Sequence, residues 1–483
     1  MTKKKIGLIL LLTGFVSSAF AGGILTNTNQ SARFARLMAL EASTRADAAY
    51  YNPAGTIKLP EGFHFTFSNQ SAFQERIINS TFEGYRGAYG SDGSNFKQFV
   101  GKASAPIIPS LQGVYRKGKW ALSGSVAVVG GGGKATFDNG LSMFEYAAAS
   151  VPALVNGIGA GMESPQAFGA NRYSVSQYMT GSNFIYGAQL GGAYEINDMF
   201  SVYGGFRLNI VHNKYEGYLK DLQTNWMSGN MASPSSLFER AVTTMEAQGA
   251  AQKDINSMYL LMKAGQEGGA QLSSKQTGWG VAPILGFHFN YEKLHIGMKY
   301  EFKTSLNVEN KTSIDDTGKN NTGMFGHGVN TAHDVPALLA IGASYDIIEP
   351  LTVSIGYHHF FDKDAGMAKD TYGISKEKHL TGGTNEYLAG IEYRIDRMFL
   401  ISMGGQITRY GLADGFQSDL SFYVNSYSLG FGGAVNVSKN VQINVGYFFT
   451  DYEDYKMAEV AGTPHNTYTR KNKVFTAGVD FSF

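Results

Sequence analysis

The stretch LHIGMKYEFK, residues 294–303, decides the fold, because its side chains alternate in character with a period of two. Its apolar members share one face of a predicted β-strand: Leu294, Ile296, Met298, Tyr300 and Phe302. The opposite face carries the charged residues Lys299, Glu301 and Lys303. A β-sandwich core would accept these charges only at high cost, whereas a barrel with its apolar face toward lipid can hold them inside.

The same alternation continues along the chain from Gly62 to the last residue. Six short turns alternate with long connections, and the segments between them number fourteen predicted strands. The short turns are RKGK from 116, EIND from 195, NYEK from 290, DIIEP from 346, RIDR from 394 and NVSKN from 436. An even strand number, short turns at one end and long loops at the other are typical of outer-membrane barrels.

Aromatic residues mark the predicted membrane boundary on the side of the short turns. Four tyrosines lie one or two residues before such a turn on the apolar face, and a fifth lies within one: Tyr115, Tyr194, Tyr345, Tyr393 and Tyr291. The last strand, KVFTAGVDFSF, ends on Phe483 and resembles the signal by which the barrel assembly machinery recognises its substrates. We therefore predict an all-β protein, a 14-stranded antiparallel transmembrane β-barrel in the bacterial outer membrane.

The first 21 residues have the features of a secretory signal peptide. Lys3–Lys5 are basic, Ile6–Val16 are apolar, and Ala19–Ala21 form a small-x-small cleavage site. This apolar run is too short for a transmembrane helix, which needs about 20 residues. The absence of cysteine excludes disulfides and thiol catalysis, and the net charge of +1 does not favour nucleic acid as a partner.

None of the candidate catalytic motifs in the sequence is complete. VVGGGGKAT, residues 128–136, lacks the first Gly and the Ser or Thr of a phosphate-binding loop. His358 and His359 would point to opposite faces of a strand and cannot jointly bind one metal. Neither a zinc-protease nor a hydrolase motif is present. We predict a protein that is not an enzyme and uses no metal or cofactor.

The connection of residues 218–273 is predicted to contain two amphipathic helices, the first starting at Ser233-Pro234. Their apolar faces include a candidate capture site for a hydrophobic ligand: Leu237, Phe238, Val242, Met245, Met258 and Met262. The helices could equally pack on each other as a lid. The two interpretations are compatible.

The N-terminal segment NQSARFARLMALEASTRADAAYYNPAG, residues 29–55, carries a resemblance to a known family. With the fourteen strands, a helical third loop and the terminal Phe, it resembles the FadL family of outer-membrane transporters for long-chain fatty acids and hydrocarbons. The motif residues are Asn52, Pro53, Ala54 and Gly55. The resemblance implies that residues 22–61 form a plug, or hatch, inside a barrel of residues 62–483. Within the plug, residues 31–43 are predicted to form a short helix, and Gly55 to redirect the chain.

The resemblance also implies a route without covalent chemistry. A hydrophobic molecule is caught between the third and fourth extracellular loops, residues 218–273 and 311–331, and passes to a pocket inside the barrel. Movement of the plug then lets it leave sideways at an inward kink of the third strand, here predicted over residues 119–129. The candidate residues for this opening are Gly124, Gly130 and Gly131.

A fatty acid needs an apolar slot and one or two basic groups. Their positions in the alternating pattern of each strand place Arg207, Lys299 and Lys303 on the inner face. They are the candidates to bind the carboxylate, unless they pair with inward acids such as Glu301 and Glu392. Apolar residues of the plug could complete the pocket: Phe34, Leu37 and Met38. Glu41 and the larger side chains around it depart from the small-residue plug of the family, so plug contacts are not transferred.

The sequence thus predicts a monomer for passive uptake of hydrophobic molecules, foremost long-chain fatty acids, with outer-membrane lipid and the assembly machinery as its other partners. Two alternatives are an adhesin or structural barrel, and a porin for polar solutes. A porin needs an open polar lumen, which a plug would contradict. An adhesin would not need amphipathic helices in its third loop.

Overall fold

The structure is a computed structural model that describes residues 23–161, 169–226, 229–370 and 373–483. The signal peptide predicted for residues 1–21 lies outside the described residues. Within the described ranges, no helix is long and apolar enough to cross a membrane.

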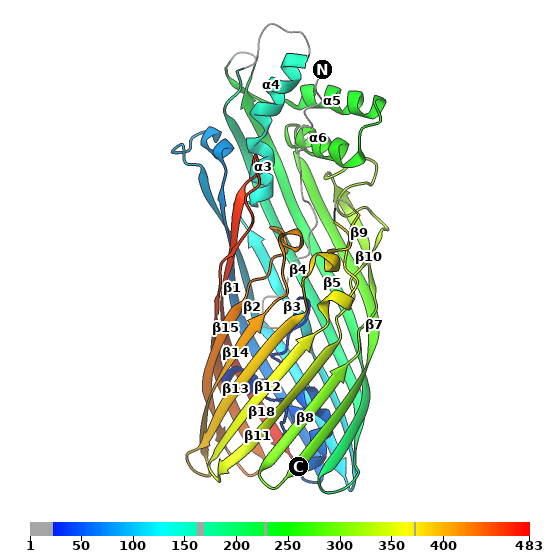
Figure 1. Ribbon diagram of the computed structural model, residues 1–483, viewed down its shortest axis with the longest axis vertical. Coiled ribbons are helices and arrows are strands. Elements are labelled where there is room, and N and C mark those ends of the chain that lie inside the picture. Colours follow the sequence, from blue (N-terminus) through cyan, green and yellow to red (C-terminus); the bar gives the residue numbers. More distant parts are fainter. Residues whose placement is uncertain (1–22, 162–168, 227–228, 371–372) are drawn as a thin grey trace.

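The wall is a closed antiparallel sheet of fourteen strands (Figure 1). They are β1 (Gly62–Thr81), β2 (Phe96–Lys117), β3 (Trp120–Phe137), β4 (Tyr173–Glu195), β5 (Phe200–Asn225), β7 (Ala270–Tyr291), β8 (Leu294–Glu301) continued by β9 (Asn307–Asp315), β10 (Asn330–Ala332) continued by β11 (Leu338–Ile348), β12 (Leu351–Phe360), β13 (Thr384–Arg394), β14 (Phe399–Arg409), β15 (Ser426–Asn436), β16 (Val441–Tyr452) continued by β17 (Tyr455–Lys456), and β18 (His465–Ser482). Pairing of β1 with β18 closes the barrel. The predicted fold class and strand number are confirmed.

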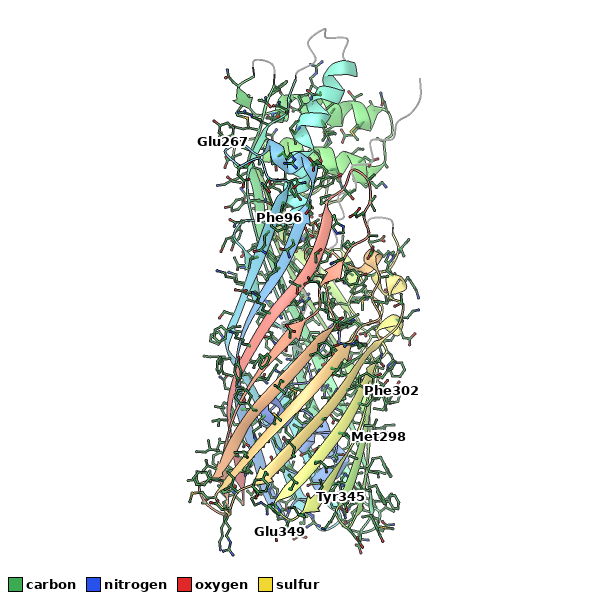
Figure 2. All side chains as sticks on the ribbon, turned by 60° about the vertical axis from the view of Figure 1, so that its left-hand side comes forward. Phe96, Glu267, Met298, Phe302, Tyr345 and Glu349 are labelled. Atoms are coloured by element: carbon green, nitrogen blue, oxygen red, sulfur yellow. The ribbon has the colours of Figure 1, made fainter. Side chains whose placement is uncertain are left out.

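The two faces of the wall differ as the opening stretch predicts. Figure 2 shows Met298, Phe302 and Tyr345 on the outer surface of the lower barrel. Lys299 and Glu301, from the other face of the same stretch, are buried in the interior. The outer face can therefore contact lipid while the inner face holds charge.

The turns confirm the predicted orientation of the strands. Six short connections lie at the end of the barrel where Gly62 and Phe483 meet: 118–119, 196–199, 292–293, 349–350, 395–398 and 437–440. The five predicted boundary tyrosines are all exposed on the outside. This end faces the periplasm in an outer-membrane barrel.

One side of the barrel is much taller than the other (Figure 1). The strands β1 to β5 and β7 have 18 to 26 residues, whereas β11 to β16 have 10 to 12. The long connections expected over residues 79–106, 132–182 and 218–273 were therefore too long. They span 82–95, 138–172 and 226–269, because the strands continue outward and pack against the helices that cap them.

The outer end carries the remaining elements. Four helices cap it, namely α3 (Ser142–Ala149), α4 (Val151–Gly161), α5 (Ser235–Ala247) and α6 (Gln252–Ala264), and the short elements are η2 (Glu83–Gly87), β6 (Met231–Ala232), η3 (Asp362–Asp364), η4 (Lys376–His379) and η5 (Asp414–Phe416). The two helices predicted in the third connection are α5 and α6. The sequence did not predict α3 and α4. They share an apolar cluster with α5 and α6 that includes Phe144, Val155, Phe238 and Leu261.

The N-terminal plug, residues 23–61, lies inside the wall and is almost entirely buried. Its elements are α1 (Phe34–Leu37), α2 (Ala48–Tyr51) and the 3-10 helix η1 (Pro53–Lys58). The helix predicted over 31–43 is wrong except for α1. It ends because Met38 adopts φ of 62°, which breaks the helical hydrogen-bond pattern.

Candidate transport site

The Asn-Pro-Ala-Gly motif fastens the lower part of the plug. The side-chain Nδ2 of Asn52 donates to the Ser43 carbonyl at 2.9 Å and to Nδ1 of His288 in β7 at 2.9 Å. Pro53 then begins η1, where its missing N–H costs nothing. A Cβ on Gly55 would lie 2.3 Å from Asn52 Nδ2. The role predicted for Gly55 is therefore corrected: its φ is not in the left-handed region, and the lack of a side chain makes room for the Asn52 amide.

An ion cluster centred on Glu392 of β13 holds the plug near the periplasmic end. The Arg36 guanidinium, fully buried, contacts Glu392 at 2.7 Å and donates to Ser402 Oγ at 2.6 Å and Asn444 Oδ1 at 2.9 Å. Arg45 contacts the other oxygen of Glu392 at 2.6 Å. The plug thus supplies the cations and the wall supplies the anion, which makes their charge-assisted bonds mutually dependent.

A second cluster contains two of the residues predicted to bind a carboxylate. Arg207 contacts both oxygens of Glu301, at 2.5 and 3.0 Å, and Lys299 contacts one of them at 2.7 Å. Lys299 also donates to the Tyr50 carbonyl of the plug at 2.7 Å, and both cations lie over the Tyr50 ring. Of the two interpretations given above, the structure shows pairing with an inward acid.

A third contact involves Glu41, the residue that departs from the family pattern. His358 lies between two carboxylates, with Nε2 at 2.8 Å from Glu41 of the plug and Nδ1 at 2.8 Å from Glu386 of β13. The absence of a side chain at Gly356 admits Glu41, since a Cβ there would lie 2.0 Å from its Oε2. Within the described ranges, no group of three His, Cys, Asp or Glu side chains could hold a metal.

The other predicted pocket residues lie in separate places. Phe34, Leu37 and Met38 are all buried. Phe34 stacks on Tyr51, so these side chains pack the plug rather than face an open cavity. Lys303 follows β8, is exposed, and pairs with Asp334 at 3.3 Å. The structure does not bring Lys303 together with Arg207 and Lys299.

The loop helices form a packed lid. Of the six predicted capture residues, four are buried and two are half-buried: Leu237, Phe238, Val242 and Met262 in the first group, Met245 and Met258 in the second. Polar contacts join the third and fourth connections: Asn256 Nδ2 donates to the Thr322 carbonyl at 2.7 Å, and Lys319 pairs with Glu246 at 2.7 Å. The two loops expected to form the capture groove are therefore in contact.

The wall has a gap in its hydrogen-bond ladder between β2 and β3. The strands pair through Gly101–Ser104 near the outer end and through Leu111–Lys117 near the periplasmic end. Between these stretches, the described register assigns no partner across the β2–β3 boundary to residues 105–110 or 127–133. Unpaired backbone groups are costly in lipid, so this interval needs hydrogen bonds from elsewhere.

The glycine-rich part of β3 lies in this gap. Gly130 and Gly131 fall within it, whereas Gly124 pairs regularly with β2. Gly131 has φ of 72°, and a Cβ on Gly130 would lie 2.3 Å from the Leu25 carbonyl of the plug. The strand expected to end at 129 continues through these glycines to 137, with register shifts against β4 in place of a loop exit.

Gln30 of the plug bridges the two edges of the gap. Its carbonyl accepts from Ser110 Oγ at 2.7 Å and from Gln112 Nε2 at 2.8 Å, both on β2. Its side-chain Nε2 donates to the Val128 carbonyl on β3 at 2.9 Å. One plug residue therefore supplies hydrogen bonds to both strands that have parted from each other.

Two arginines that sequence reasoning missed face the interior closer to the outer end. Arg76 of β1 and Arg470 of β18 are directly cross-strand partners and are 2% and 5% exposed. Arg470 lies over the rings of Phe422 and Tyr423 at 5.0 and 5.1 Å. Arg76 Nε donates to Gln74, and no acidic residue of the described chain forms an ion pair with Arg76. The alternation of side chains along each strand would have placed both arginines on the inner face. That they are neighbours can be known only from the register of β1 against β18.

A third cation lies near the same aromatic residues. Tyr423 lines a small cavity of about 10 Å³ together with Lys376, Phe416 and Leu25. Burial lowers the pKa of Lys376 to about 8, although the neighbouring Asp370 opposes this shift. The region next to the plug therefore combines basic groups with apolar and aromatic side chains, which is the combination that an amphiphile with an anionic head requires.

The chain is similar to known proteins in its structure but not detectably in its sequence. No protein-family model matches the chain, and no curated protein matches its sequence. A Pseudomonas aeruginosa FadL homologue is similar with a TM-score of 0.63 and 12% identity, over 96% of this chain and all of that one. The Pseudomonas putida toluene transporter TodX gives 0.54 and 14%, over 97% and 100%. The Ralstonia pickettii toluene transporter TbuX gives 0.50 and 15%, over 91% and 94%.

These similarities cover nearly the whole chain, so they concern the complete architecture of barrel and plug. A closed, even-stranded barrel with an apolar outer face and short turns at one end is the architecture of bacterial outer-membrane proteins. The expected location is thus confirmed. The chain has the fold of the FadL family.

Proposed function

We propose that the protein is a transporter for passive uptake of hydrophobic molecules across the outer membrane, with long-chain fatty acids as the preferred cargo. The observation that carries the proposal is the bridge made by Gln30 across the gap between β2 and β3. A plug residue that completes the wall couples plug position to wall opening. The structural similarity to a FadL homologue and to a toluene transporter supports a hydrophobic cargo.

In the proposed route, a molecule enters past the loop helices and rests beside the aromatic residues next to the plug. Displacement of the plug breaks the three Gln30 hydrogen bonds and removes this bridge across the β2–β3 boundary, where residues 105–110 and 127–133 do not pair with each other. The molecule then passes sideways between the strands into lipid, so its apolar part never crosses water. Gradient-driven diffusion suffices, and no covalent step is needed.

The preference for fatty acids rests on Arg76 and Arg470. Like charges opposite each other on neighbouring strands are unfavourable, and a carboxylate between two guanidiniums would relieve this repulsion. The rings of Phe422 and Tyr423 offer apolar contact for the start of an acyl chain. A toluene-like hydrocarbon could use the rings but gains nothing from the arginines.

The remaining partners follow from the architecture. Outer-membrane lipid would contact the apolar face of the wall, and the assembly machinery would recognise β18. A single closed barrel provides the whole route, so the working unit is a monomer. The filled lumen argues against a porin for polar solutes, and the packing of α5 and α6 into a lid gives no support to an adhesin.

A reversible cross-link tests whether the plug gates transport. A Cβ on Gly286 of β7 would lie 3.5 Å from Cβ of Ala54 in the plug motif, which is within reach of a disulfide. The natural chain has no cysteine, so Ala54→Cys/Gly286→Cys introduces the only pair. Uptake of labelled oleate and of toluene is measured in cells that lack their own transporter.

We expect the oxidised double variant to lose at least tenfold in uptake and to recover when a reductant is added. Each single-cysteine variant serves as the matched control and should transport normally. Normal flux in the fully cross-linked protein would overturn plug gating. Failure of the natural, correctly assembled protein to take up either compound would overturn the transport function itself.

A further inference from the structure

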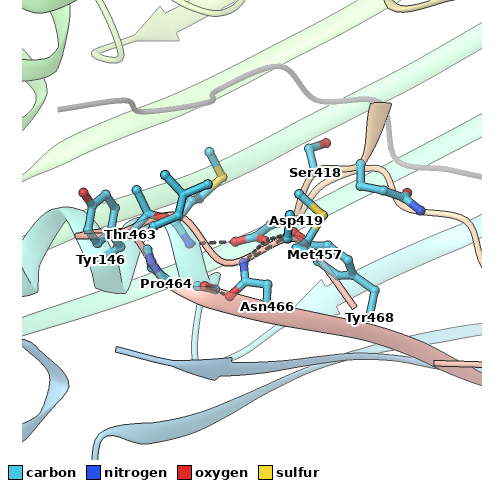
Figure 3. Close-up of a pocket in the computed structure, with 13 residues that line it drawn as sticks. Tyr146, Ser418, Asp419, Met457, Thr463, Pro464, Asn466 and Tyr468 are labelled. Carbon is cyan, nitrogen blue, oxygen red and sulfur yellow. Dashed lines mark hydrogen bonds between the residues drawn. The ribbon is translucent and has the colours of Figure 1, made fainter. Parts of the chain in front are cut away.

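A separate cavity lies among the outer loops, away from the plug (Figure 3). It has a volume of about 210 Å³ and is bounded by α3, by the connection between β14 and β15, and by the segment that leads into β18. Met143, Met457, Val460 and Pro464 supply apolar wall, and Tyr146 adds a ring. None of the residues predicted from the sequence as a binding site lines this cavity.

The polar part of this cavity is organised around Asp419. Its Oδ2 accepts from the Met143 backbone N–H at 2.6 Å, and its Oδ1 accepts from Tyr468 Oη at 2.9 Å and Asn466 Nδ2 at 3.3 Å, as drawn in Figure 3. Asp419 is 6% exposed. Two of its three donors come from β18 and one from α3, so these two segments together fix the carboxylate in one orientation.

Asp419 has no counter-charge in the described part of the chain, where no Lys, Arg or His side chain forms an ion pair with it. The nearest pair on α3 is already satisfied, because Glu145 is bound by Lys97, Tyr173 and Gln177. A buried carboxylate without a cation is costly. A carboxylate can accept about four hydrogen bonds, and only three donors are in place.

We propose that this cavity binds a compact, single-ring apolar molecule that carries one protonated amine, with the ammonium group on Asp419 and the ring between Met143, Met457 and Val460. The donor head supplies both the missing hydrogen bond and the missing positive charge. A cavity of 150 Å³ lined by apolar groups can hold benzene, so about 210 Å³ accommodates a ring and a short head. A long acyl chain does not fit.

The charge of this site is opposite to that of Arg76 and Arg470. A carboxylate ligand would meet Asp419 at close range and be repelled, so this cavity excludes the molecules that the arginines favour. The proposal stands on the cavity and its carboxylate alone and does not depend on transport of any cargo.

The test uses three isosteric probes with the full-length mature protein in detergent: 4-bromobenzylamine, 4-bromobenzoate and 4-bromotoluene. Calorimetry measures affinity, and the anomalous signal of bromine in soaked crystals locates the ring. We expect 4-bromobenzylamine to bind at least tenfold more tightly than either other probe, with its bromine beside Met457 and its nitrogen within hydrogen-bond distance of Asp419.

Two variants separate the carboxylate from the cavity. Asp419→Asn keeps the shape and should weaken amine binding at least tenfold, whereas Asp92→Asn, on the exposed first outer connection, is the matched control and should bind normally. Val460→Trp should block binding by filling the mouth, and it keeps the test decisive if Asp419→Asn does not fold. Equal binding of the benzoate, bromine density elsewhere only, or normal amine binding by a folded Asp419→Asn or Val460→Trp would overturn the proposal.

Discussion

The lower and upper parts of the barrel interior both contain buried cationic side chains, but they arrange them in opposite ways. In the lower part, filled by the plug, Arg36 and Arg45 share Glu392, while Arg207 and Lys299 share Glu301. In the upper part, Arg76 and Arg470 stand side by side across two strands, next to aromatic rings. Cations neutralised by the wall hold a structure together, whereas adjacent cations with no acid on Arg76 are suited to receive an anion.

The two arrangements also differ in what makes them energetically unfavourable. Paired ions inside a protein contribute little net stability, yet removal of one partner is expensive because the other remains buried and uncompensated. Neighbouring like charges are unfavourable until a ligand arrives. The lower interior should therefore respond to mutation by loosening the plug, and the upper interior, under the proposed function, by losing affinity for carboxylate cargo.

The largest effect is expected from Glu392→Ala. It leaves Arg36 fully buried without its anion, which should destabilise the plug by about 3–5 kcal/mol. Tryptic cleavage within the plug and ion conductance in planar bilayers should both rise. Glu349→Ala, at an exposed periplasmic turn labelled in Figure 2, is the matched control. Unchanged protection and conductance in Glu392→Ala would mean that this cluster does not hold the plug.

An intermediate effect is expected from Arg76→Gln. Loss of a charge-assisted hydrogen bond to a carboxylate costs about 1.5–3 kcal/mol, so the KM for oleate uptake should rise about 10- to 150-fold. Toluene uptake should not change, because a hydrocarbon makes no such bond. Arg397→Gln, on an exposed turn, provides the control. Equal loss for both cargoes would assign Arg76 a structural role, and no loss for either would remove it from recognition.

The smallest effect is a pH dependence at Asp419. Burial, as the largest cause, raises the pKa of this carboxyl to about 6, while hydrogen bonds from Met143 and Tyr468 oppose the shift. Only the ionised form pairs with an ammonium group, so affinity for 4-bromobenzylamine should increase up to tenfold per pH unit below about pH 6 and level off above it. The other titratable groups that face the cavity, Tyr146 and Tyr468, stay neutral over this range.

The same shift fixes the sign of the stability effect in the unliganded protein. Because the pKa of Asp419 is raised on folding, its contribution favours folding below its unfolded value of about 3.8 and is lost as the pH rises through about 6. The pH dependence of binding would be measured by calorimetric titration with 4-bromobenzylamine between pH 5 and pH 8. A flat profile, or the same slope in Asp419→Asn, would assign the dependence to another group.

The wall could be predicted from the sequence because its signal is long and regular. Alternation like that of residues 294–303 recurs in most of the strands, and each short turn interrupts it at a clear position. The length of β5 could not be predicted, because its outer half packs against helices that are distant in sequence. The helix α4 contains Pro152, Gly157, Gly159 and Gly161, which conceal it from propensity arguments.

The site was less predictable than the wall. Parity placed Arg207 and Lys299 inside correctly, but it could not show that both would meet Glu301, since that contact depends on the register of β5, β7 and β8. The plug helix failed for a related reason. Met38 leaves the helical region where its neighbour Arg36 binds wall residues from three different strands, and these long-range contacts cannot be predicted from local periodicity.

The unequal height of the wall changes where a solute first meets the protein. A membrane strand needs about 9–11 residues to cross the hydrocarbon core, whereas β5 has 26 and carries the helical cap at its far end. More than half of that strand is therefore an overhang beyond the acyl chains. A sparingly soluble molecule dispersed in water reaches this overhang before it reaches the lipid head groups. The proposed route can therefore begin on the aqueous side, and prior partitioning of the solute into the bilayer is not required.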